Sequence, residues 1–268
     1  MSAGTDDFFD ARAARLRTSE LAFEALLAEH PAKLRPIRPG WHAQCVAGLA
    51  RLGALGEDGP HPALRDGLGA ILAGACTVEL RISSPRSSVL HRVWLLGHTA
   101  AWVRQGDPIE FLCQRNDLVP HRLADLLTVG PRAAPVTGLA DSTTVRVARR
   151  VIDALLAGAP ENRNAAAAMI VQRCGPRLQR WCADLVAGRW QAWHAEMTWR
   201  VGDHGWSGRA VICLDTPTGF LVATPLDGRQ VELRPVRPEE LWRRLLRMMP
   251  PPDDLEAAAA GWLERTRQ

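Results

Sequence analysis

The sequence of 268 residues lacks the long apolar segments by which membrane and secreted proteins are recognised. No run of 18 or more apolar residues occurs, which argues against a helix that crosses a membrane. The first residues, MSAGTDDFFDARAARLR, place acidic side chains where a secretory signal needs basic residues and an apolar core. With 47% hydrophobic residues, the chain can still bury a sizeable core. We therefore expect a globular, cytoplasmic protein.

Metal-binding and disulfide patterns are also missing. No two of the six cysteines stand at the C-x-x-C spacing of zinc and redox sites, and most lie in apolar periodic segments. The eight histidines form no H-x-x-x-H or H-E-x-x-H motif. The sequence thus predicts buried, reduced thiols, no metal site and no cofactor.

Motifs of catalysis are scarce as well. GLGAILAG, residues 67–74, lacks the third glycine of G-x-G-x-x-G and precedes a strand, which is the reverse of a dinucleotide-binding turn. GWSGR does not fit G-x-S-x-G, and no phosphate-binding G-K-[ST] motif occurs. We therefore expect a protein that is not an enzyme, although active sites can be assembled from residues scattered along a chain.

Tyrosine is absent, and Lys33 is the only lysine among 33 basic residues, a bias typical of a GC-rich genome. The net charge of +4 does not demand a polyanionic partner. A pI near 9.0 and two arginine clusters nevertheless leave nucleic-acid binding as the alternative function. Helical spacing spreads the arginines of each cluster around the helix, and acidic residues lie nearby, so we expect both clusters to lie on solvent-exposed helix faces. One cluster is Arg146, Arg149 and Arg150, and the other is Arg243, Arg244 and Arg247.

The first half of the chain is predicted to form helices and then a sheet. Apolar residues at helical spacing predict helices over residues 19–29, 42–56 and 62–74. Alternation of apolar and polar residues then predicts a four-stranded meander. A helix with Pro120 in its first turn closes this half. The predicted strands are residues 76–84, 89–98, 100–107 and 109–115.

The same order recurs in the second half. Helices are predicted over residues 143–158, 161–174 and 176–188, and a closing helix over 237–249. The predicted strands are residues 190–202, 208–216, 219–227 and 230–235. A last short helix from Asp254 could dock through Leu255 and Trp262.

A constant offset of 118 residues relates the two meanders and their closing helices. It is shown by the pairs Val93 and Val211, Leu96 and Leu214, Trp102 and Phe220, Pro120 and Pro238, and Leu123 and Leu241. We interpret the chain as one α+β domain built from two quasi-symmetric halves, with a central twisted sheet flanked by helical bundles. Its parts are an N-terminal half (1–129), a Gly/Pro/Ala-rich linker (130–142), a C-terminal half (143–250) and a tail (251–268).

The segment VICLDTPTGFLVA, residues 211–223, followed by PEELWRRLL, gives the best local evidence of a family. In this segment Asp215 and Gly219 bracket a tight turn, whose simplest role is to fix the hairpin. Supporting passages are ELAFEALLAEHPAKLRPIRPGW and ALRDGLGAILAGACTVELRISS. In these passages and in the order of its elements the chain resembles the EspG family, the cytosolic chaperones of ESX (type VII) secretion systems.

The resemblance implies a non-enzymatic chaperone that binds the tip of a helical PE-PPE heterodimer and keeps it soluble for export. The short link SSPRSS, residues 83–88, departs from members that carry a longer substrate-binding loop there. A helical hairpin of the WXG type is therefore an alternative partner. The oligomeric state of the free protein stays open.

Three groups of residues are candidates for the partner-binding surface. On the strand from residue 190, alternation assigns Trp193, Ala195, Met197 and Trp199 to the core, and the opposite side to a partner or to solvent. The strand 208–216 is apolar on both sides, which predicts cover by the protein itself or by a partner. The closing helix offers tryptophan and arginine, residues common in binding hot spots. The candidates are His194, Glu196, Thr198 and Arg200; Ile212 and Leu214; and Trp242, Arg243 and Arg247.

Overall fold

The computed structural model describes residues 7–32, 42–132, 144–202 and 205–267. Within them, a single antiparallel sheet of 11 strands runs in the order β1-β2-β8-β7-β6-β5-β10-β11-β12-β13-β9. The strands of the N-terminal half are β1 (Phe8–Asp10), β2 (Arg15–Thr18), β5 (Cys76–Ser83), β6 (Ser88–Leu96), β7 (Thr99–Arg104) and β8 (Ile109–Arg115). Those of the C-terminal half are β9 (Val145–Ala148), β10 (Gln191–Val201), β11 (Gly205–Thr216), β12 (Gly219–Pro225) and β13 (Gln230–Val236). A separate small ribbon joins β3 (Leu55–Gly56) and β4 (Gly59–Pro60).

The two halves meet at the antiparallel pair β5 and β10. From this seam each half continues outward through its meander. Short strands from the beginning of each half follow at the edges, β2 and then β1 in the N-terminal half and β9 in the C-terminal half. Residues related by the offset of 118 occupy matching places. Val93 of β6 pairs with β5, and Val211 of β11 pairs with β10. Both valines lie in one core cluster with Leu123 and Leu241, which are fully buried. The predicted α+β fold with two quasi-symmetric halves is confirmed.

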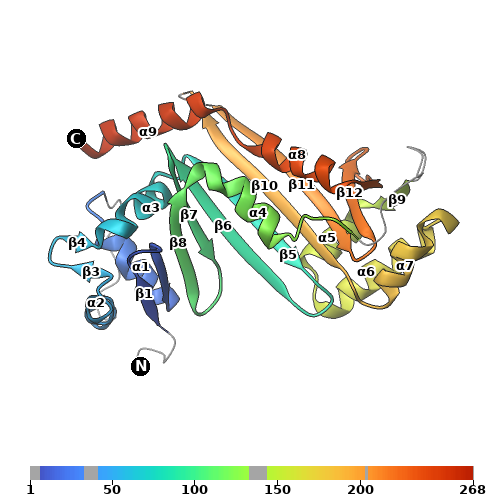
Figure 1. Cartoon of the computed structure of the whole chain (residues 1–268), viewed down its shortest axis with the longest axis horizontal. Coiled ribbons are helices and arrows are strands. Elements are labelled where there is room, and N and C mark those ends of the chain that lie inside the picture. Colours follow the sequence, from blue (N-terminus) through green and yellow to red (C-terminus); the bar gives the residue numbers. More distant parts are fainter. Residues whose placement is uncertain (1–6, 33–41, 133–143, 203–204, 268) are drawn as a thin grey trace.

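The helices divide between the two faces of the sheet (Figure 1). We call the face under α4 and α8 the α4/α8 face, and the opposite one the bundle face. At one end of the bundle face lie α1 (Glu20–Ala28), α2 (His42–Arg51) and α3 (Pro62–Ala73). At the other end lie α5 (Arg149–Ala157), α6 (Pro160–Arg173) and α7 (Gln179–Val186). The α4/α8 face is covered by α4 (Val119–Leu126), α8 (Pro238–Met248) and α9 (Pro252–Arg267).

Each face has its own core, because side chains alternate along every strand. On the α4/α8 face, one cluster joins Trp193, Ala195, Met197 and Trp199 of β10 to residues of α4, α8 and α9, as the alternation predicted. On the bundle face, one cluster lies under α1–α3 and a second under α5–α7. Leu255 and Trp262 of α9 are buried, so the tail is docked.

Several predictions about local structure differ from the structure. The helix predicted over residues 42–56 ends at Arg51, and Leu55–Gly56 form β3. Residues 145–148 are the strand β9, not the start of a helix, because the alternating Val145 and Val147 pair with β13. Residues 8–18, for which no element was predicted, form β1 and β2 beside β8. The proposed linker lies outside the described residues from residue 133 onward.

Candidate partner-binding surface

The seam of the sheet carries polar side chains on the bundle face, between the two bundles. The bundle α1–α3 packs through α3 on β6, β7 and β8. The cluster under α5–α7 reaches from β9 to Ala192 near the start of β10, and α5 also contacts the end of β5. Glu196 points out between them, with 52% of its side chain exposed. We call these residues the central strip: Thr77, Glu79 and Arg81 of β5, and His194, Glu196 and Thr198 of β10.

Two glutamates stand directly opposite each other in the middle of the central strip. Glu79 pairs with Glu196 across the seam, and like charges in this position destabilise a sheet. Arg92 of β6 offsets the repulsion, because its Nε lies 2.8 Å from Glu79 Oε1. His194 Nε2 lies 3.9 Å from Glu196 Oε2, but burial lowers the pKa of His194. At neutral pH, the charge of Glu196 is therefore left for solvent or for a basic group of a partner.

A tryptophan extends the central strip at one end. Arg200 and Trp206 face each other across the β10–β11 hairpin, and Trp206 is 63% exposed. Sequence reasoning missed Trp206, although the alternation that places Ile212 on the bundle face also places residues 210, 208 and 206 there. Exposed aromatic side chains of this size are frequent anchors of protein interfaces.

The two candidates on β11, Ile212 and Leu214, differ in solvent exposure. Ile212 is half-buried opposite His194, at the border between the central strip and the cluster under α5–α7. Leu214 is only 2% exposed and packs in that cluster with Leu221 and Trp181. Its assignment to a partner surface is therefore corrected, because the protein itself covers this part of the strand.

The candidates on α8 lie on the opposite face of the sheet. Trp242 is half-buried, with its ring centroid 5.2 Å from that of His121 on α4. Arg243 and Arg247 are exposed and line a groove of about 480 Å³ between α8 and the end of β11. The structure thus does not bring these three residues together with the central strip.

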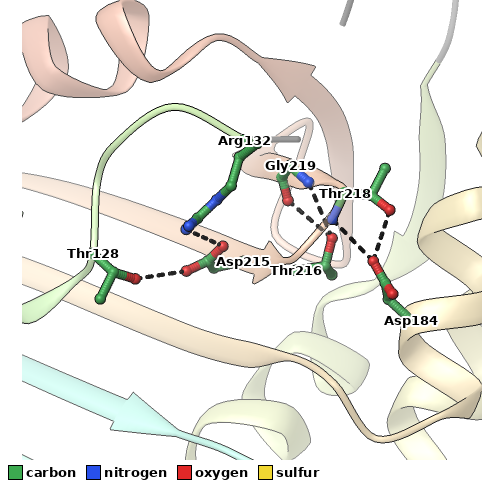
Figure 2. A network of polar contacts seen from close by, with 7 residues as sticks. All are labelled: Thr128, Arg132, Asp184, Asp215, Thr216, Thr218 and Gly219. Atoms are coloured by element: carbon green, nitrogen blue, oxygen red, sulfur yellow. Dashed lines mark hydrogen bonds and ion pairs between the residues drawn. The ribbon is translucent and has the colours of Figure 1, made fainter. Parts of the chain in front are cut away.

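The DTPTG turn forms a polar network that ties three segments together (Figure 2). Thr216 Oγ1 bonds to the backbone of Gly219, which closes the hairpin as predicted. Thr218 donates from its backbone N–H and its hydroxyl to Asp184 of α7, at 3.0 and 2.7 Å. The turn is therefore joined to the bundle face as well as to its own hairpin.

Asp215 joins this turn to the N-terminal half, a contact that the sequence did not predict. Its carboxylate accepts from Arg132 Nη2 at 2.7 Å and from Thr128 Oγ1 at 3.5 Å, just after α4. Burial raises the pKa of Asp215 to about 6, although Arg132 and Thr128 act in the opposite direction. Arg132 also lies over the ring of Phe220, 4.3 Å from its centroid. We interpret this group as a structural clamp between the halves.

No protein-family model and no curated protein sequence matches the chain. A solved structure does, that of the Mycobacterium tuberculosis type VII secretion system chaperone EspG5 in complex with a PE25-PPE41 dimer. It aligns with a TM-score of 0.56 and 12% sequence identity, over 88% of this chain and 97% of that chain. The two chains share one fold. The predicted resemblance to the EspG family is therefore confirmed at the level of the fold, and the structural neighbour is a chaperone rather than an enzyme. Among the described helices, none is both long and apolar enough to cross a membrane.

Proposed function

We propose that this chain is a cytosolic chaperone that binds helical substrates of a type VII (ESX) secretion system and keeps them soluble for export. The observation that supports the proposal is the central strip of an EspG-type fold, in which the exposed Glu196 and its half-buried neighbours lie between the two bundles. The function needs no cofactor and no chemical step, because shielding is achieved by reversible contact alone.

The central strip favours a partner with a particular surface. Glu79 and Glu196 can pair with lysine or arginine, and Trp206 and Ile212 offer apolar contact beside them. A polar strip flanked by apolar anchors fits the end of a helical hairpin, where a few apolar side chains stand among polar ones. We propose a PE-PPE-like heterodimer as the first substrate class and a WXG-type hairpin as the second.

The test is direct binding to purified substrates from the organism that encodes this chain. We would co-express the chain with each PE-PPE heterodimer and each WXG-type dimer, isolate complexes by size exclusion and measure affinity by calorimetry. Glu196→Lys and Trp206→Ser should each weaken binding by about tenfold or more, the loss typical of a hot spot. Glu161→Lys makes the same charge change at an exposed position of α6 and should leave the affinity within about twofold.

Other outcomes would contradict the proposal in distinguishable ways. A loss of binding in Arg243→Glu, with Glu196→Lys unaffected, would move the surface to α8. If neither substrate class binds and the protein instead binds DNA or RNA with a steep salt dependence, the nucleic-acid alternative replaces the chaperone. Binding of both substrate classes by Glu196→Lys and Trp206→Ser as tightly as by the unaltered protein would exclude the central strip.

A further inference from the structure

We propose that the N-terminal half holds a second site, which binds a small organic anion with an apolar body. The site is a cavity of about 430 Å³ on the α4/α8 face, a size within the range of small-molecule pockets. Strands β2, β5, β6, β7 and β8 and the helix α4 form it, together with the short link before β6 and Gln191 at the start of β10. The central strip lies on the other face, so this proposal does not depend on the proposed function.

Basic side chains dominate the rim of this cavity. Arg15, Arg104 and Arg122 line it with one carboxylate, that of Glu110. Glu110 lies 3.2 Å from Arg104 and 3.6 Å from Arg15, so a single negative charge faces two guanidinium groups. Arg122 makes no salt bridge with any described residue. Burial and Arg15 lower the pKa of Arg122, while Asp125 and Glu110 act in the opposite direction.

The matching place in the C-terminal half carries a carboxylate instead of Arg122. The offset of 118 relates Arg122 of α4 to Glu240 of α8, so the two halves carry opposite charges at this position. Glu240 lies 2.5 Å from Arg234 and 2.9 Å from Arg244, and so it pairs with two arginines. The N-terminal half has arginine where this carboxylate stands. A bound anion would supply a negative charge there, as Glu240 does in its counterpart.

The floor of the cavity is apolar and includes one buried donor without a partner. Leu112 and Leu126 line it beside Trp102, over which Arg122 lies at 5.4 Å from the ring centroid. Trp102 Nε1 is buried and has no hydrogen-bond partner. His91, also in the lining, has its pKa lowered to about 4 by burial and by Arg104 and Arg122, and so it adds no charge at neutral pH. The cavity therefore combines apolar side chains with planar cationic groups, which suit a phosphate or carboxylate.

The probe we would use is phenyl phosphate, added to the full chain labelled with ¹⁵N. The indole N–H resonance of Trp102, assigned with Trp102→Phe, should shift saturably. Arg122→Gln and Arg104→Gln should each raise the Kd at least about tenfold. Arg146→Gln is the matched control, because Arg146 is an exposed arginine 3.3 Å from Glu232 in the other half, and its Kd should stay within about twofold.

Two further ligands test separately whether the charge and the apolar ring of the probe contribute to binding. Benzyl alcohol keeps the ring but has no charge, and inorganic phosphate keeps the charge but has no ring. Each should bind at least about tenfold more weakly than phenyl phosphate if charge and apolar floor both contribute. The proposal is overturned if phenyl phosphate gives no saturable shift, if Arg146→Gln weakens binding as much as Arg122→Gln, or if inorganic phosphate binds equally well.

Discussion

Replacing Arg132 with glutamine should destabilise the protein at neutral pH and much less in mild acid. Asp215 has a pKa of about 6, raised above its ordinary value by burial, while the side chain of Arg132 is only 20% exposed. Because the pKa is raised in the folded state, the stability that this carboxyl contributes is fully present below its ordinary pKa, near 4. It is lost as the pH rises through about 6. Arg132 limits that loss by pairing with the ionised form.

The size of the effect follows from the contact that the substitution removes. The bond from Arg132 Nη2 to Asp215 Oδ1 is 2.7 Å long, and a charge-assisted hydrogen bond of this kind contributes about 2 kcal/mol. At about pH 7.5 Asp215 is ionised, so we expect Arg132→Gln to lower the free energy of unfolding by about 2 kcal/mol or more. At about pH 5 Asp215 is mostly protonated, and the loss should fall to about 0.5 kcal/mol, the cation–π contact with Phe220 being removed at both pH values.

Urea unfolding followed by tryptophan fluorescence measures both values. Asp215→Asn is the control, because an amide does not titrate; in that background, Arg132→Gln should cost the same at both pH values. An equal cost at about pH 5 and about pH 7.5 in the background with Asp215 would refute the reasoning, since it would mean that the charge of Asp215 plays no part.

Three shorter predictions test other parts of the structure. Leu214→Glu should prevent folding, seen as loss of the soluble protein or of its near-UV dichroism, because it buries a charge in the cluster under α5–α7. Ser19→Ala should lower the free energy of unfolding by about 1 kcal/mol in urea titrations, because Ser19 Oγ accepts from the N–H of Ala22 at the start of α1. Gly219→Ala should lower the thermal midpoint by several degrees in calorimetry, because φ is 155° and a Cβ would stand 3.4 Å from the ring of Trp181.

Much of the sheet could be predicted because its long strands alternate strictly. In β10, eleven residues give enough periods to assign every side chain to a face, and the burial of Trp193 and Trp199 agrees. The short strands could not be predicted in this way. β1 has three residues and β9 has four, so the alternation is too short to outweigh the helical signal that follows β9.

The candidate surface was only partly predictable, because sequence patterns describe one element at a time. Alternation identified the outward side of β10, including Glu196, but could not tell that Leu214 on the same face lies under a helix. The contact between Arg132 and Asp215 joins residues 83 positions apart. The periodicity of a single element does not predict contacts between residues so far apart in the sequence. This contact follows only from how the two halves pack together.

The symmetry of the fold explains why the central strip remains open. Each half places a bundle over its own meander, so the bundles lie toward opposite ends of the sheet, while α4 and α8 contact each other on the other face. On the bundle face, α5 contacts one end of the seam, where Ser83 Oγ donates to the backbone carbonyl of Leu156 at 2.6 Å, and the middle of the seam around Glu196 stays exposed. A glutamate from each half meets there, at a cost to the sheet that Arg92 only partly offsets. A basic group of a partner placed between Glu79 and Glu196 would relieve that repulsion and at the same time contact both halves.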